Sequence, residues 1–141
     1  MIRQANEKDL DEIILLSKAT LNNSFSKENL QSIIKEKETY HLFIIGEEII
    51  YGFIILWISE ENSQIIDFAI NLKNRRLGYG KKLLNYSIDF LKDKNVKLIS
   101  LEVRETNHNA IKLYELFDFK IIKTINNYYK NENGLLMMRS L

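Results

Sequence analysis

Residues 67–80 read Asp-Phe-Ala-Ile-Asn-Leu-Lys-Asn-Arg-Arg-Leu-Gly-Tyr-Gly, and this stretch indicates the fold most directly. It begins inside an apolar segment, residues 64–71, that predicts a strand. It ends where apolar side chains recur at helical spacing up to about residue 93. Between the two, the pattern Arg75-x-x-Gly78-x-Gly80 predicts a loop that leads directly into a helix.

This loop has the features of a pyrophosphate-binding site. The first turn of a helix has N–H groups without partners and the positive end of the helix dipole. Glycine has no side chain to keep an anion away from them, and Arg75, Arg76 and Lys81 add positive charge. Glycines beside basic residues also occur in ordinary turns. The loop has neither the Gly-Lys-Ser/Thr ending of a nucleotide-triphosphate loop nor a Gly-x-Gly-x-x-Gly fingerprint.

The rest of the chain predicts alternating helices and strands. The predicted strands are residues 1–4, 40–45, 49–59, 64–71, 96–103, 120–127 and 135–140. Besides the helix after Gly80, helices are predicted to start after Asn6, Ser26 and Asn107, the first extending to Leu21. This order predicts an α/β (α+β) fold with a mixed central sheet of about seven strands and helices on both faces.

Composition limits the possible chemistry. The chain has 141 residues, which predicts a single domain, residues 1–141. It has no cysteine, so disulfides, thiolate metal sites and thiol nucleophiles are excluded. His41 lies in an apolar strand pattern and His108 at a helix start, so we expect a packed and a solvated residue respectively, and no metal site. Carboxylates, tyrosines, backbone amides or a cofactor must do the chemistry.

The charge and the apolar pattern also limit the partners and the location. A net charge of +1 leaves no electrostatic footprint for nucleic acid or for an anionic membrane. No apolar run approaches the roughly 18 residues of a membrane-spanning helix, and the first residues do not resemble a secretion signal. We therefore expect a cytoplasmic protein that is a monomer or a weak dimer and recognises its partner by shape and local contacts.

Three blocks of the sequence resemble the GNAT superfamily of N-acetyltransferases. Residues 67–80 resemble its acetyl-coenzyme A motif, a strand followed by a Gln/Arg-x-x-Gly-x-Gly/Ala loop and a helix. Residues 101–107, Leu-Glu-Val-Arg-Glu-Thr-Asn, and residues 110–119 resemble its second block. Together with Asn-Tyr-Tyr at 127–129 they are most similar to the RimI-type enzymes, the ribosomal-protein-alanine N-acetyltransferases. The resemblance extends from about residue 50 to the end and is looser before that.

The resemblance implies the GNAT fold, with a mostly antiparallel sheet, and acetyl-coenzyme A (acetyl-CoA) as donor. It implies that Glu102 is the general base and Tyr114 the general acid, and that Phe25, Tyr128 and Tyr129 lie near the acceptor. The residues implied to contact the cofactor are Phe68, Ala69, Ile70, Arg75, Arg76, Leu77, Gly78, Tyr79, Gly80, Lys81 and Asn107.

Each of these residues also has a purely structural interpretation. Glu102 is consistent with an exposed carboxylate at the end of a strand, and Tyr114 with a core residue at helical spacing from Ala110 and Phe117. Asn107 is expected to cap a helix under either interpretation, because its side chain can cap and still face a ligand. Tyr128 and Tyr129 are also typical of ordinary sheet residues.

Two positions depart from the family pattern. Asp118 stands where the family usually has a glycine that ends a helix with positive φ, a conformation that aspartate tolerates better than most residues. Glu132-Asn133-Gly134 replaces the Glu-Asp-Ala that RimI-type enzymes tend to have before the last strand. These departures leave the fold and the cofactor better supported than the acceptor.

The leading hypothesis is direct acetyl transfer, in a ternary complex, to the N-terminal α-amine of a ribosomal protein, with alanine as the first residue. An α-amine, with a pKa near 8, loses its proton more easily than lysine, with a pKa near 10.4. The alternatives are the same chemistry on a small amine, an antibiotic or a lysine side chain, and a non-catalytic acyl-CoA-binding module. The presence of both Glu102 and Tyr114 argues against the module, which needs neither.

Overall fold

The computed structural model describes residues 1–20 and 25–141. Its strands are β1 (Ile2–Gln4), β2 (Tyr40–Gly46), β3 (Ile50–Ser59), β4 (Asn62–Ile70), β5 (Leu98–Arg104), β6 (Lys120–Tyr129) and β7 (Glu132–Ser140). Its helices are α1 (Leu10–Thr20), α2 (Lys27–Lys35), α3 (Tyr79–Asp93) and α4 (His108–Leu116), with short 3₁₀ turns η1 (Glu7–Asp9) and η2 (Leu72–Asn74). The predicted order of elements is confirmed.

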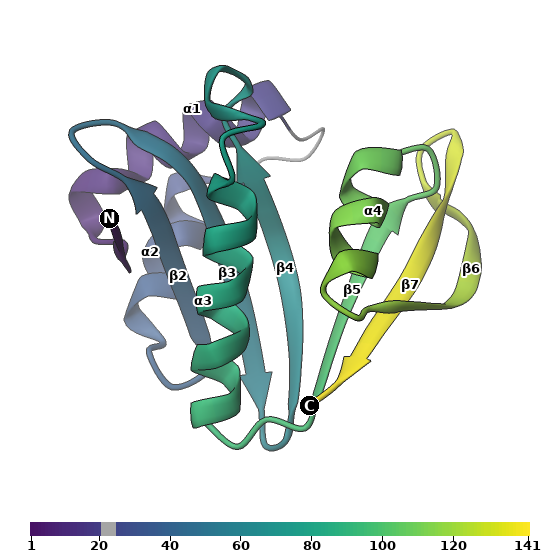
Figure 1. Cartoon of the computed structure of the whole chain (residues 1–141). Coiled ribbons are helices and arrows are strands. Elements are labelled where there is room, and N and C mark those ends of the chain that lie inside the picture. The colour runs from purple at the N-terminus through teal and green to yellow at the C-terminus, as the bar shows by residue number, and fades with distance from the viewer. Residues whose placement is uncertain (21–24) are drawn as a thin grey trace.

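In the described part of the chain the strands form one seven-stranded sheet in the order β1-β2-β3-β4-β5-β7-β6. Neighbouring strands are antiparallel except β4 and β5, which are parallel. This parallel pairing is short, because it joins only residues 62–64 of β4 to residues 98–100 of β5. Beyond it the two strands diverge, so that the sheet opens into a V (Figure 1).

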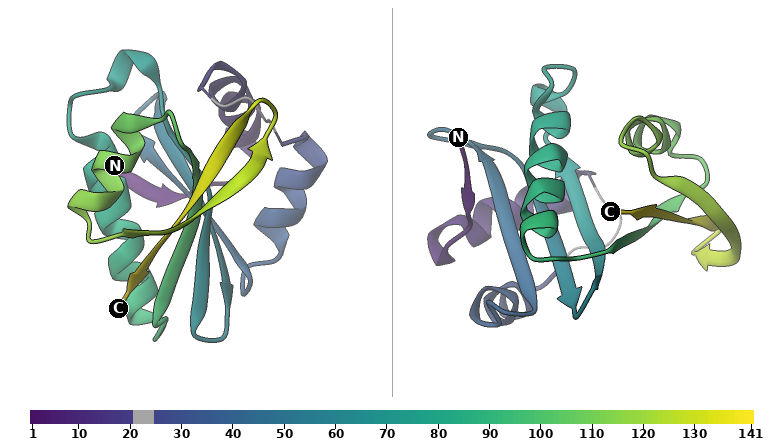
Figure 2. Two further views of the ribbon diagram at one scale, coloured as in Figure 1. Left: turned by 90° about the vertical axis from the view of Figure 1, so that its right-hand side faces the viewer. Right: turned by 60° about the horizontal axis from the view of Figure 1, so that its bottom comes forward.

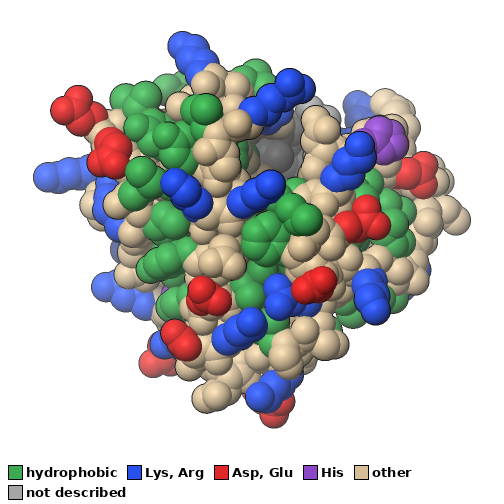
Figure 3. All heavy atoms as spheres, viewed as in Figure 1, with side chains coloured by type: hydrophobic (Ala, Val, Ile, Leu, Met, Phe, Trp, Pro, Cys, Tyr) green, Lys and Arg blue, Asp and Glu red, His purple; other side chains and the backbone are tan. Residues whose placement is uncertain are grey.

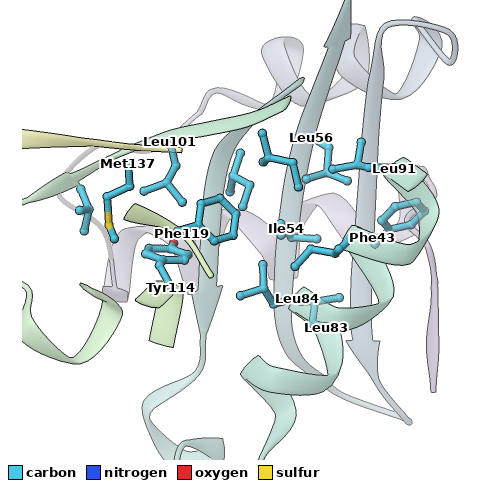
Figure 4. Close-up of a cluster of buried hydrophobic side chains, with 14 of the residues drawn as sticks. Phe43, Ile54, Leu56, Leu83, Leu84, Leu91, Leu101, Tyr114, Phe119 and Met137 are labelled. Atoms are coloured by element: carbon cyan, nitrogen blue, oxygen red, sulfur yellow. The ribbon is translucent and has the colours of Figure 1, made fainter. Parts of the chain in front are cut away.

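Helices cover both faces of the sheet, as predicted (Figure 2). Side chains of α3 and α4 pack with side chains of the sheet in one buried cluster, the α3–α4 cluster. Figure 4 shows that this cluster extends from Phe43 and Leu91 beside α3 to Phe119 and Met137 beside α4. Residues of α1 and α2 form a second buried cluster with the sheet, the α1–α2 cluster, which includes Leu10 and Phe53. The first cluster joins both halves of the split sheet, whereas the sheet residues of the second belong to β2, β3 and β4. No helix in the described ranges is long and apolar enough to cross a membrane.

The local signals for helix ends are confirmed by the structure. The side chains of Asn6, Ser26 and Asn107 each accept a hydrogen bond from a backbone N–H of the following turn. Asp118 has φ of 68°, the left-handed conformation expected from the glycine that the family has there. The prediction that the first helix reaches Leu21 lies outside the described residues.

Several strand ends differ from the expected ones. β4 begins at Asn62 rather than at residue 64, because it pairs with β3 up to the tight turn after Ser59. β6 and β7 extend toward each other until Tyr129 pairs with Glu132. The polar residues of this hairpin tip resemble a loop in the sequence, yet they pair because the neighbouring strand is already in register.

Candidate functional site

A cavity of about 620 Å³ lies where β4 and β5 diverge. It is lined by residues from both faces of the split sheet. The lining residues are Thr20, Ile65, Ile66, Asp67, Phe68, Leu101, Glu102, Val103, Arg104, Asn107, Ala110, Tyr114, Tyr128 and Tyr129. Six of the residues predicted from the sequence are therefore brought together here, namely Phe68, Glu102, Asn107, Tyr114, Tyr128 and Tyr129.

The loop before α3 has the backbone of an anion-binding turn. Gly78 is the N-cap of α3 with φ of 84°, and no side chain caps this helix. The N–H groups of its first turn therefore remain available to a ligand. A Cβ at Gly78 would meet no atom within 4 Å, so conformation rather than space requires glycine there. A Cβ at Gly80 would lie 3.7 Å from Phe68, which shows that this turn adjoins the cavity.

Positive charge surrounds the same turn. Arg75, Arg76 and Lys81 are exposed, and none of them forms a salt bridge with a described residue. The Arg75 Nε donates a hydrogen bond of 3.1 Å to the Ile70 carbonyl, which ties the loop to the end of β4. Figure 3 shows Lys and Arg side chains spread over the face that includes this loop, interspersed with Asp and Glu. Two further predicted loop residues are uncharged: Leu77 is exposed, and the Tyr79 ring lies 4.7 Å from the Tyr51 ring in a tilted arrangement.

A β-bulge in β4 shapes the cavity wall. In the pairing with β3, Leu56 lies opposite Ile65 but Ile55 lies opposite Asp67, so one extra residue is inserted in β4. As a result Ile65 and Phe68, three residues apart, both pack against the α3–α4 cluster. Ala69 is buried in the α1–α2 cluster and, unlike Phe68, does not line the cavity.

Glu102 lies on the sheet face opposite to α3 and α4. It alternates with Leu101 and Val103, which belong to the α3–α4 cluster, and strand side chains alternate between faces. The Gln64 side chain, across the parallel pairing on β4, donates a hydrogen bond of 2.9 Å to the Glu102 carboxylate. Partial burial, followed by the charge of Glu102, raises the pKa of Tyr128.

Tyr114 and Asn107 approach the cavity from α4. Tyr114 is 7% exposed, and its ring lies 6.3 Å from that of Phe68 and 5.7 Å from that of Phe119. Burial, reinforced by the charges of Asp67 and Tyr129, raises the pKa of Tyr114 well above its usual value, so the phenol stays protonated. Asn107 accepts a 3.3 Å hydrogen bond from the Ala110 N–H through its Oδ1. The Nδ2 of Asn107 has no partner among the residues described, and it is free to donate into the cavity.

The β6–β7 hairpin is fixed to the cavity by Arg104, which sequence reasoning missed. Its guanidinium donates to the Glu132 carboxylate at 3.0 Å and lies 4.3 Å from the centre of the Tyr129 ring. The Thr106 hydroxyl donates to the same carboxylate at 2.8 Å. Burial is the main cause that raises the pKa of Tyr129 to about 12. The departure from the family pattern is thus confined to Asn133 and Gly134, whereas Glu132, which matches the pattern, binds the hairpin to Arg104 and Thr106.

Phe25 is not among the residues that line the cavity. It is half-buried against the α1–α2 cluster, so its role near the acceptor stays a prediction. Asp67, for which no role was predicted from the sequence, does line the cavity. A lone acid between Ile66 and Phe68 in an otherwise apolar strand was the signal that could have identified it. Within the described ranges no group of His, Cys, Asp and Glu is arranged to hold a metal ion.

Comparisons with known proteins agree with the geometry. The model of the acetyltransferase (GNAT) family matches residues 8–119. An N-alpha-acetyltransferase from Saccharolobus solfataricus is 30% identical, covering 99% of this chain and 92% of its own. The ribosomal protein bS18-alanine N-acetyltransferase of Escherichia coli K12 is 33% identical over 59% of this chain and 56% of its own. The crystal structure of the Escherichia coli ribosomal-protein-S18-alanine N-acetyltransferase has a TM-score of 0.90 at 25% identity, covering 99% of this chain and 92% of that one.

Proposed function

Because this chain belongs to the acetyltransferase (GNAT) family and is an N-acetyltransferase, we propose that it acetylates the N-terminal α-amine of a protein, with acetyl-CoA as donor. We further propose that the acceptor is a ribosomal protein whose first residue is alanine. The observation that supports the proposal is the cavity between β4 and β5. The anion-binding turn of α3 adjoins it on one face of the sheet, and Glu102 lines it on the other. Donor and acceptor can therefore meet inside the sheet.

The proposed donor site follows from the groups around the turn of α3. Backbone N–H groups after Gly78, with Arg76 and Lys81 beside them, would hold the pyrophosphate. The Asn107 Nδ2 would donate to an amide of the pantetheine arm. The walls of β4 and β5 would then enclose the thioester, with Phe68 and Tyr114 on one side. Acetyl-CoA supplies an acyl group that is already activated.

The proposed reaction is direct attack of the amine on the thioester carbonyl, without an acetyl-cysteine intermediate, because the chain has no cysteine. The acceptor nitrogen must lose two protons between ammonium and amide. Glu102 takes the proton that is lost as the C–N bond forms and the C–S bond breaks. The Tyr114 hydroxyl donates its proton to the departing sulfur, which ends as a thiol, and Tyr114 regains a proton from solvent. Both protons of the nitrogen reach solvent, one of them through Glu102, so the net reaction leaves one proton on the sulfur and one in solvent.

The donor site is tested by placing a β-branched side chain in the turn. Gly78→Val should weaken the affinity for acetyl-CoA at least tenfold, about 1.4 kcal/mol, because it obstructs the N–H groups and disfavours their conformation. Isothermal calorimetry measures this. Asn95→Val is the matched control, because it places the same side chain at another positive φ, 62°, at the opposite end of α3. If the wild type, Gly78→Val and Asn95→Val bind acetyl-CoA with equal affinity, the turn is not part of the donor site.

The acceptor class is tested with one peptide that offers two kinds of amine. A peptide with a free N-terminal alanine and an internal lysine should be acetylated at the α-amine, which is about two pKa units easier to deprotonate. Tandem mass spectrometry locates the acetyl group. The matched control is the same peptide already acetylated at its N-terminus, which should not react. Acetylation of lysine, or of small amines in place of both peptides, would favour the alternative acceptors.

A further inference from the structure

Asp67 is a second carboxylate of the cavity, and the reaction described above gives it no task. The bulge in β4 decides where it lies, because the inserted residue pairs Asp67 with Ile55. Ile55 is buried in the α1–α2 cluster, and paired residues of antiparallel strands share a face. Asp67 therefore lies on the same face of the sheet as Glu102. Both residues line the same cavity, one from each arm of the V.

Within residues 1–20 and 25–141, no group neutralises Asp67. Among the described residues its carboxylate has neither a hydrogen-bond nor an ion-pair partner. Asp9, by contrast, is a buried carboxylate that has a partner. It binds the Arg3 guanidinium at 2.8 Å, and this hydrogen bond is the main cause that lowers the pKa of Asp9. A shielded carboxylate is normally paired, so the open side of Asp67 in the cavity is where a cationic partner would bind.

The other charged or titratable groups around the cavity make it acidic. β5 contributes Glu102 and Arg104, α4 contributes Tyr114, and β6 contributes Tyr128 and Tyr129. The pKa values of Tyr114 and Tyr129, the two tyrosines near Asp67, are both raised, so these side chains stay neutral near pH 7. The one positive group among these, Arg104, is already bound to Glu132. The cavity therefore presents two carboxylates and attracts a cation.

We propose that Asp67 binds the ammonium form of the acceptor amine and accepts the first of its two protons. This inference rests on the proposed function and completes its proton balance. One N–H bond of the ammonium breaks, the proton passes to an Asp67 oxygen, and the freed electron pair of the nitrogen attacks the thioester carbonyl. Glu102 then takes the second proton as the amide forms. The proton on Asp67 leaves to solvent when the product departs.

The pKa of Asp67 suits this task. Burial raises it to about 7, and a general base works best with a pKa near the working pH. An α-amine with a pKa near 8 is about nine-tenths protonated at pH 7, so most acceptor molecules arrive with the extra proton. Above about pH 9 the amine is mostly neutral and needs no such base. The contribution of Asp67 to the rate should therefore be largest between about pH 7 and pH 8, where its carboxylate is mostly ionised and the amine is still mostly protonated, and it should be small near pH 9.

The same burial predicts the stability of the test variant. The folded protein binds a proton at Asp67 up to about pH 7, whereas an unfolded aspartate loses it near pH 3.9. Stability is therefore lost as the pH rises from about 4 to 7, and the charged form remains costly above that range. Asp67→Asn avoids this cost. The variant should melt at a higher temperature than the wild type at pH 8, so a loss of activity cannot be attributed to unfolding.

The experiment compares Asp67→Asn with Asp89→Asn, which removes an equal charge from the exposed face of α3. Calorimetry in the presence of coenzyme A should show at least tenfold weaker binding of the alanine peptide to Asp67→Asn at pH 7.5. The N-acetylated peptide should bind both variants and the wild type equally. The turnover of Asp67→Asn should fall by about 10²-fold at pH 7.5 and approach that of the wild type at pH 9. Asp89→Asn should match the wild type throughout.

Three outcomes decide between the proposals. If Asp67→Asn binds the free-amine peptide as the wild type does, or loses the same factor in turnover at pH 7.5 and pH 9, Asp67 does not accept the ammonium proton. If the wild type acetylates a small primary amine instead of the peptide, the acceptor proposal fails, and Asp67 is tested on that amine by comparing pH 7.5 with a pH above the pKa of the amine itself. If the wild type acetylates no amine at all, the proposed function and this inference fall together.

Discussion

Replacing Glu102 with Gln is expected to lower the rate of acetyl transfer by about 10²- to 10⁴-fold, the usual contribution of general acid–base catalysis. The amide has the shape of the carboxylate, and its oxygen can still accept the hydrogen bond from Gln64. The position of the side chain is therefore kept while the base is removed. Single-turnover kinetics with saturating acetyl-CoA measure the loss.

The affinity for acetyl-CoA should be unchanged in this variant, because Glu102 lies on the sheet face opposite to α3. Glu105→Gln is the matched control, since Glu105 is an exposed carboxylate just beyond the end of β5. It should react at the wild-type rate and melt at a similar temperature. Near wild-type turnover of a folded Glu102→Gln variant would assign its proton transfer to water.

Replacing Tyr114 with Phe is expected to slow the departure of the thiolate by about 10²-fold. The ring still fills the space beside Phe68 and Phe119, so the stability should change little. Burial raises the pKa of Tyr114, and burial in the same cavity should raise the pKa of the departing thiol. The phenol can therefore still donate to the sulfur while the C–S bond breaks.

The leaving group provides a specific test of this role. The defect of Tyr114→Phe should shrink with a thioester donor whose thiol is more acidic, because its thiolate leaves without help. Tyr86→Phe is the matched control, because Tyr86 is a partly exposed tyrosine of α3 outside the cavity. If Tyr114 is only a core residue, its Phe variant will match Tyr86→Phe with every donor.

The order of elements and the donor turn could be predicted from the sequence, because their signals are local. Apolar spacing gave each helix and strand, and the side chains of Ser26 and Asn107 cap helices through neighbouring N–H groups. Gly78 adopts the positive φ for which glycine is suited, and Asp118 tolerates the conformation of the glycine that it replaces. In each case the residues that decide the outcome lie within a few positions of one another.

The sequence by itself therefore determined the order of elements, the turn of α3 and the resemblance that singled out Glu102 and Tyr114. Only the tertiary structure decided what faces the cavity. The contact between Gln64 and Glu102 joins residues far apart in the chain, and so does the contact between Arg104 and Glu132. The position of Asp67 depends on a single inserted residue in β4, which reverses the alternation of faces along the strand. Periodicity cannot locate such an insertion, because the bulge exists only in the pairing of β4 with β3.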